Sequence, residues 1–173
     1  MSSLVRIGVI GERRASAAML QAAEEVGREI ARRGGILICG GMEGVMEAAS
    51  RGAAAAGGIV VGILPGSSAA SGNEFVTIPI VTGMGEARNV IIARTAEALV
   101  AVGGAYGTLS EIAYALQFGV PVIGLQTWEL RRPGVEGDPV LRAPTPEAAV
   151  DWAWDAAARR RTGAGGARLE EQS

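Results

Sequence analysis

Short apolar segments alternate with longer amphipathic segments along most of the chain. Residues 4–10 are rich in β-branched side chains and precede Gly11, which is typical of a buried strand. Residues 16–33 instead repeat their apolar side chains with helical spacing, with Ser16 as the expected N-cap. The same alternation predicts strands at 36–39, 59–64, 75–81, 98–102 and 120–125, and helices at 44–56, 85–95, 108–118 and 145–160.

This order of elements predicts the fold class. The strands are nearly continuous apolar runs, as expected for strands that helices cover on both faces. We therefore expect an α/β protein, namely a three-layer, doubly wound, Rossmann-like fold with a mostly parallel sheet of about six or seven strands. We expect one domain over residues 1–161, with an irregular segment at 126–144 and a disordered, glycine-rich tail at 162–173. In such a sheet the ligand binds at the carboxyl ends of the strands.

The side chains missing from the sequence exclude several kinds of chemistry. Of the 173 residues, 16 are basic and 18 are acidic, and His is absent. Every basic residue is Arg, so the chain offers no Lys for a pyridoxal phosphate Schiff base or a Walker A loop. Without His there is no Ser-His-Asp or Cys-His catalysis, and Cys39 alone cannot build a zinc site. Carboxylates, arginines, hydroxyls and backbone amides remain.

Charge and cysteine content also limit the partners. A net charge of -2 gives no general attraction to nucleic acid. No run of 18 apolar residues predicts a membrane span. A single cysteine permits no intrachain disulfide, which favours the cytoplasm. We expect neither nucleic acid nor a membrane as a partner.

Glycines gather directly after the predicted strands. Tight turns alone would explain many of them, but together they favour a phosphate site, because glycine lets an anion approach the amides at helix N-termini. The strongest candidate follows the strand at 98–102, where Thr108 is expected to begin a helix. Glu111 lies about one turn further along and has the capping-box spacing from Thr108. The expected phosphate-binding residues are Gly104, Ala105, Tyr106, Gly107 and Thr108.

Two other glycine-rich segments follow strands that end at the same edge. Segment 83–89 brings Arg88 there, where it would hold a phosphate or stabilise a leaving group, although an ordinary helix start is the simpler interpretation. In segment 40–46, Met42 would line an apolar pocket for a planar base. The remaining candidates for ligand binding are Gly11, Gly40, Gly41 and Gly44.

The three glycine-rich segments, 40–46, 83–89 and 103–111, together resemble the LOG-like family of Rossmann proteins, which is part of the SLOG superfamily. The resemblance covers residues 5–125. The family's founders are cytokinin-activating phosphoribohydrolases, and many members were mislabelled as lysine decarboxylases. Residues 103–111 are similar to the family's Pro-Gly-Gly-x-Gly-Thr-x-x-Glu signature, with glycine at the proline position and Ala105 at the second glycine. Of the Met-His-x-Arg-Lys signature Arg88 is kept, while Glu86 and Asn89 replace His and Lys. That form resembles the branch that includes molybdenum cofactor carrier proteins.

The resemblance implies a phosphorylated, nucleotide-like ligand, a homodimer, no required cofactor, and Arg88 with Glu111 as the catalytic pair of hydrolase members. One hypothesis is hydrolysis of the N-glycosidic bond of nucleoside 5′-monophosphates, with Glu111 activating water or stabilising a ribosyl cation. The alternative is a non-enzymatic carrier of the molybdenum cofactor, a pterin with one phosphate. A DNA-processing relative is a third reading, against which the acidic balance argues.

Overall fold

The computed structural model describes residues 4–163, and a seven-stranded sheet runs through them in the order β4-β3-β2-β1-β5-β6-β7. The strands are β1 (Arg6–Gly11), β2 (Ile36–Cys39), β3 (Ile59–Leu64), β4 (Ile78–Val81), β5 (Ala98–Val102), β6 (Val122–Leu125) and β7 (Leu141–Arg142). The helices are α1 (Ala17–Arg32), α2 (Val45–Ala55), α3 (Asn89–Thr95), α4 (Tyr106–Gln117) and α5 (Pro146–Arg161), with 3₁₀ turns η1 (Ala69–Ser71) and η2 (Gly85–Arg88). Most of the predicted tail, 164–173, lies outside the described residues.

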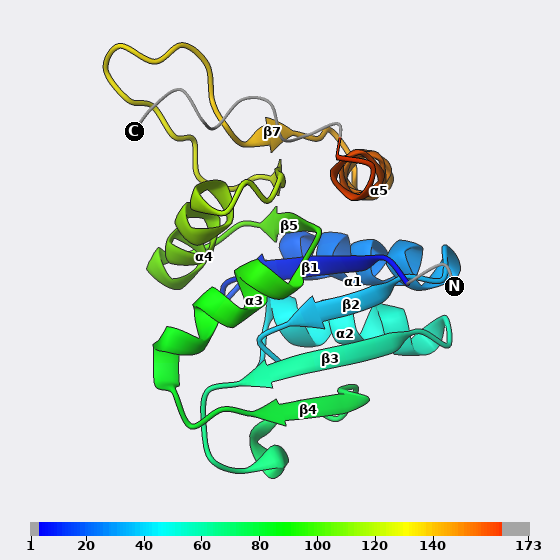
Figure 1. The fold of residues 1–173 in the computed structure, drawn as a ribbon. Helices are drawn as coiled ribbons and strands as arrows, with labels where there is room; N and C mark the ends of the chain where they lie inside the picture. The colour runs from blue at the N-terminus through cyan, green and yellow to red at the C-terminus, as the bar shows by residue number, and fades with distance from the viewer. Residues whose placement is uncertain (1–3, 164–173) are drawn as a thin grey trace.

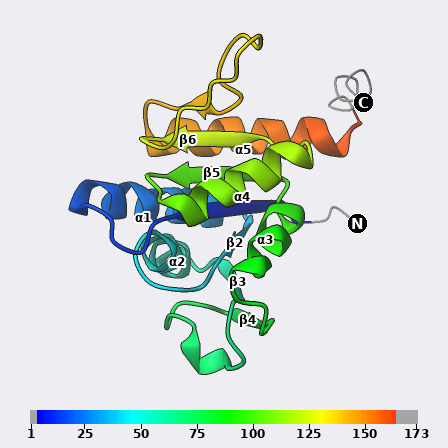
Figure 2. The same ribbon diagram turned by 90° about the vertical axis from the view of Figure 1, so that its left-hand side faces the viewer.

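Helices cover the sheet from both sides (Figures 1 and 2). One apolar core forms between the sheet and α1, α2 and α5, and a second forms between the sheet and α3 and α4. All strand pairs are parallel, and the order reverses between β1 and β5, where a doubly wound sheet opens its ligand crevice. The predicted three-layer, doubly wound α/β fold is confirmed.

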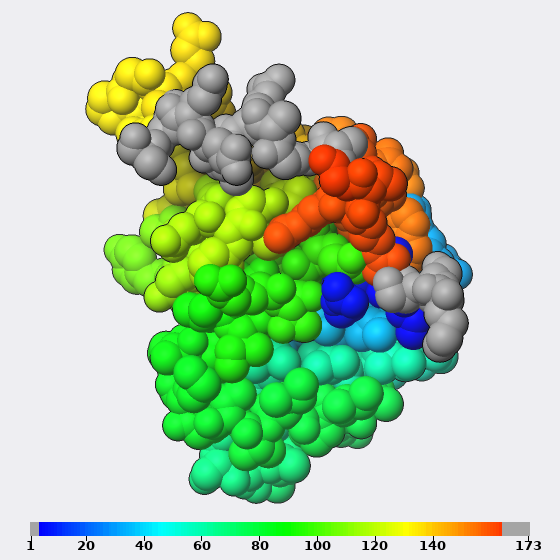
Figure 3. All heavy atoms as spheres, in the orientation of Figure 1, coloured from blue at the N-terminus to red at the C-terminus, as the bar shows by residue number. Residues whose placement is uncertain are grey.

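Most of the predicted elements are present, and the differences fall on short or edge segments. Ser16 caps α1 by accepting a hydrogen bond from the amide of Met19 at 3.2 Å, as predicted. The fourth strand begins only at Ile78, because Asn73 holds the preceding residues in a turn. The helix predicted at 85–95 is divided into η2 and α3. Segment 126–144 projects from the body of the molecule (Figures 1 and 3) and contains β7, which pairs with β6.

An exposed apolar area lies at the β4 edge of the sheet, on the side that α3 and α4 cover elsewhere. Ile78 and Ile80 are 47% and 42% exposed, and Ile59 of β3 on the same face is 37% exposed. A parallel sheet normally has both faces covered, so this uncovered face is unusual. Among the described residues, no helix combines the length and apolar character needed to cross a membrane.

Helices α1 and α2 approach each other closely because glycines face the contact. A Cβ atom on Gly27 would lie 1.9 Å from the carbonyl oxygen of Ala49. A Cβ atom on Gly52 would lie 1.9 Å from the carbonyl oxygen of Glu24. Each helix therefore presents bare backbone to the other at these points, and any larger side chain would force the helices apart.

We predict that Gly52→Ala lowers the free energy of unfolding by about 1–3 kcal/mol, because the added methyl group overpacks this contact. On the exposed face of a helix a Gly→Ala substitution would instead raise the free energy of unfolding by up to about 1 kcal/mol. The sign of the change at Gly52 therefore shows whether the contact is closely packed. Gly107→Ala in α4 is the matched control, since a Cβ atom there meets no atom within 4 Å. Urea denaturation measures both variants, and a more stable Gly52→Ala protein would contradict the close packing.

Candidate functional site

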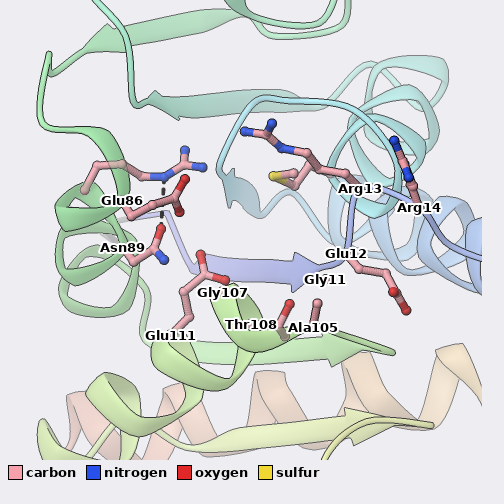
Figure 4. A pocket seen from close by; sticks show the side chains of 12 residues that line it. Gly11, Glu12, Arg13, Arg14, Glu86, Asn89, Ala105, Gly107, Thr108 and Glu111 are labelled. Carbon is pink, nitrogen blue, oxygen red and sulfur yellow. Dashed lines mark hydrogen bonds between the residues drawn. The ribbon is translucent and has the colours of Figure 1, made fainter.

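A pocket of about 460 Å³ opens at the carboxyl edge of the sheet, next to the point where the strand order reverses (Figure 4). Four segments that are far apart in the sequence meet there. The lining residues are Gly11, Glu12, Arg13 and Arg14 after β1, Met46 of α2, Glu86, Arg88 and Asn89 of η2 and α3, and Ala105, Gly107, Thr108 and Glu111 around the start of α4. The fold thus brings the predicted Arg88 segment and the predicted phosphate-binding segment together.

The N-terminus of α4 faces this pocket without a cap. The helix begins at Tyr106 and its N-cap is Ala105, so the prediction that Thr108 starts the helix is wrong by two positions. No side chain caps the helix, and its first turn contains no acidic residue. The expected capping box of Thr108 and Glu111 is therefore not formed. The free N–H groups and the positive end of the helix dipole remain available to an anion.

The turn before α4 accommodates Ala105 without strain. Ala105 has a φ of -97°, which suits any residue, while the positive φ angles fall on Gly103 and Gly104. The amide of Gly104 donates a hydrogen bond to Oε1 of Glu12 at 3.3 Å. One of the amides predicted to bind phosphate thus already has a carboxylate partner.

Glu111 is a buried carboxyl whose side chain points into the pocket (Figure 4). It is only 7% exposed, and no described residue hydrogen-bonds to its side chain or forms a salt bridge with it. Burial raises the pKa of Glu111 to about 8, although the charge of Arg88 opposes this. At neutral pH the carboxyl is therefore mostly protonated.

Arg88 is 4% exposed and its guanidinium group is bound to backbone. Its Nη1 donates to the carbonyl oxygen of Gly40 at 2.7 Å and also to that of Ile63, and its Nε donates to Oδ1 of Asn89 at 3.0 Å (dashed in Figure 4). Burial lowers the pKa of Arg88 from its ordinary value. The residue predicted to hold a phosphate is thus committed mainly to fixing η2 against the ends of β2 and β3.

The other glycine-rich segment contributes to the site less directly. Gly11 lines the pocket, whereas Gly40 and Gly41 form the turn after β2, and the carbonyl of Gly40 holds Arg88. Met42 packs against the core and does not line the pocket. Met46 packs in the core and also lines the pocket.

Tyr106 lies on the surface beside the pocket rather than in it. Its side chain is 80% exposed, and its ring centroid lies 5.8 Å from that of Trp128. Trp128 in turn donates from Nε1 to the carbonyl oxygen of Ala105 at 3.3 Å. The aromatic pair therefore supports the turn before α4 from outside.

Sequence reasoning missed Glu12, Arg13 and Arg14, which all line the pocket. Three consecutive charged residues directly after the first strand were the available signal. In the sequence such a run resembles an ordinary solvated turn, and only the folded loop shows that it lies over the ligand edge.

Comparisons with known proteins place the chain among relatives of similar length. Residues 4–150 match the model of the SLOG cluster4 family. An uncharacterized protein of Archaeoglobus fulgidus is 46% identical over 149 residues, which are 86% of this chain and 94% of the relative.

Solved structures resemble the whole described fold. The molybdenum cofactor binding protein from the phototrophic bacterium Rippkaea orientalis is 34% identical with a TM-score of 0.80, over 90% of this chain and 98% of that one. The molybdenum cofactor carrier protein from Chlamydomonas reinhardtii is 36% identical with a TM-score of 0.78, over 89% of this chain and 99% of that one.

The raised pKa of Glu111 predicts a pH-dependent stability. Between the unfolded pKa of about 4.5 and the folded value of about 8, the native state holds a proton that the unfolded state has lost. Glu111 thus makes stability fall as pH rises through this window, by up to about 1.4 kcal/mol per pH unit. In Glu111→Gln this contribution is absent.

Urea denaturation from pH 5 to pH 8.5 measures how the free energy of unfolding of wild type and of Glu111→Gln depends on pH, with the exposed Glu43→Gln as control. Parallel pH profiles for wild type and Glu111→Gln would contradict the raised pKa.

Proposed function

Because the chain belongs to the SLOG cluster4 family, we propose that it binds the molybdenum cofactor at the carboxyl edge of its sheet and carries it without a reaction of its own. One observation carries this proposal. The pocket lies at the uncapped N-terminus of α4, in a fold that matches a molybdenum cofactor binding protein and a carrier protein over nearly their full lengths.

The chemistry of the lining residues suits a phosphorylated pterin. The first-turn amides of α4 would receive the phosphate, as helix N-termini commonly do. Met46 supplies a polarizable side chain against which a planar ring system packs well. The volume of about 460 Å³ falls within the range of small-molecule sites.

Hydrolysis of nucleoside 5′-monophosphates is the second candidate, since Arg88 and Glu111 line one pocket. Two features put it second. A mostly protonated Glu111 lacks the charge that would activate water or stabilise a ribosyl cation. Nη1 of Arg88 is bound to two backbone carbonyls and Nε to Asn89, so only Nη2 remains for a nucleotide.

We also propose a homodimer in the cytoplasm. The exposed apolar face formed by Ile59, Ile78 and Ile80 supports the dimer, because a second copy would cover it. Cys39 is a buried free thiol, which suits a reducing compartment.

Replacing Ile80 with Arg should convert the dimer to a monomer, because it places a charge in the apolar face. Light scattering after size-exclusion chromatography measures the mass, and wild type should show twice the mass of one chain. Val135→Arg is the matched control, because Val135 is 47% exposed on the projecting segment. A wild-type monomer, or an Ile80→Arg protein that remains dimeric, would show that this face is not the interface.

Adding molybdenum cofactor should raise the thermal midpoint of the protein and slow the oxidation of the cofactor in air. Gly107→Asp should abolish both effects, because a carboxylate at the start of α4 repels the phosphate while remaining favourable to the helix itself. The position tolerates a side chain, since a Cβ atom there meets no atom within 4 Å. Gly107→Asn, which adds a similar volume without charge, should keep most of the binding.

Two results would contradict the carrier function. One is a wild-type protein that neither gains stability from the cofactor nor protects it. The other is release of free base from nucleoside 5′-monophosphates that is lost in Glu111→Gln, which would establish the hydrolase instead.

A further inference from the structure

The segment after β1 is held firmly at the mouth of the pocket. The carbonyl of Glu12 accepts a hydrogen bond from the amide of Val45 at 3.1 Å, and its carboxylate accepts one from the amide of Gly104 at 3.3 Å. Gly44, with a φ of +72°, packs directly beneath, where a Cβ atom would lie 2.3 Å from the carbonyl oxygen of Arg13. The backbone that carries Arg13 and Arg14 is therefore fixed relative to both α2 and the turn before α4.

Arg13 and Arg14 extend from this segment into the pocket lining. Figure 4 shows Arg13 across the cavity from Ala105 and Thr108 at the start of α4, and Arg14 further out on the same segment with its guanidinium group directed away from α4. Neither arginine has a hydrogen-bond or salt-bridge partner among residues 4–163. Arg33, at the opposite end of α1, shows the contrast, because it forms a salt bridge with Asp151 at 2.6 Å.

The pocket lining combines three arginines, Arg13, Arg14 and Arg88, with the carboxyl groups of Glu12, Glu86 and Glu111. Among the described residues, none of these carboxyl groups forms a salt bridge with Arg13 or Arg14. Burial lowers the pKa of Arg88 most, the charges of Glu111 and Glu86 oppose this, and the charge of Arg13 adds a smaller lowering. Glu111 contributes little negative charge at neutral pH. The partial positive charge of the α4 N-terminus adds to the same field.

A second observation points independently to a ligand here. Glu111 is more than nine-tenths buried, has no hydrogen-bond partner among the described residues, and points into the same cavity (Figure 4). Its carboxyl group therefore faces the cavity, where a bound molecule with a hydrogen-bonding group can reach it.

We propose that Arg13 and Arg14, together with the first-turn amides of α4, form a clamp for a doubly charged phosphate monoester. The guanidinium groups bind its oxygens from one side and the amides bind them from the other. The proposal rests on the proposed function only in assigning this phosphate to the pterin. In this clamp Arg13 and Arg14, rather than Arg88, supply the positive charge that binds the phosphate. The phosphate, rather than the ring system, is then the main source of affinity.

Inorganic phosphate is the probe that tests the clamp by itself. In low-salt buffer at pH 8, where phosphate is mainly a dianion, it should raise the thermal midpoint of wild type in proportion to its concentration. Arg13→Gln and Arg14→Gln should each weaken the apparent affinity for phosphate about tenfold. Arg159→Gln is the matched control, because it removes the same charge from an exposed position in the last turn of α5. Thermal midpoints without phosphate show that each variant folds.

The possible outcomes separate this clamp from the proposed function. If phosphate leaves wild type unaffected, or affects wild type and both pocket variants equally, the clamp is overturned. If molybdenum cofactor binds wild type and both variants with equal affinity, the carrier function stands and the clamp falls. If phosphate binding needs both arginines but the cofactor has no effect, the clamp stands and the carrier function falls.

Discussion

The buried guanidinium group of Arg88 is the interaction on which the geometry of the pocket depends. It reaches the carbonyl oxygens of Gly40 and Ile63, which lie at the ends of β2 and β3. The adjacent Asn89 donates to Oγ of Ser110 in α4 at 3.1 Å. The sheet edge, α3 and α4 are thereby joined through neighbouring residues. Burying a cation is unfavourable unless its donors are satisfied, so these hydrogen bonds also stabilise the folded state of the segment.

A pocket built in this way is largely organised before a ligand binds. Its walls are strand ends, helix starts and a loop that Glu12 fixes on two sides, and none of these needs a ligand for its position. Preorganised donors reduce the entropy cost of binding a ligand. A mostly protonated Glu111 and an Arg88 that is bound through Nη1 and Nε leave two donors, the carboxyl O–H and Nη2, for a ligand.

The amino-acid composition of the chain limits which groups in the pocket can bind a phosphate. With neither Lys nor His available, backbone amides, hydroxyls and arginines are the main groups that can hold a phosphate. The structure supplies both at one place, through the uncapped α4 and the segment that follows β1. The absence of a capping side chain on α4 is then part of the site, because a cap would occupy the amides that a phosphate needs.

Much of this could be predicted from the sequence, because the fold follows from periodicity. The apolar strands and the Ser16 cap are local signals that folding preserves. The role of Arg88 could not be predicted, because its partners lie 48 and 25 residues away and are backbone carbonyls without a side-chain signature. The place of Arg13 in the pocket could not be predicted for a similar reason. A charged turn after a strand is usually solvent-exposed, and only the tertiary structure shows that this turn lies beside the pocket. Strand β7 has only two residues, too few for a pattern.

A crystal structure of the protein grown with molybdenum cofactor would show where the cofactor binds. We expect one cofactor in the pocket between β1 and α4, with its phosphate oxygens within hydrogen-bond distance of the first-turn amides of α4. A cofactor bound elsewhere on the protein, or one bound in this pocket with its phosphate turned away from α4, would overturn the proposed site.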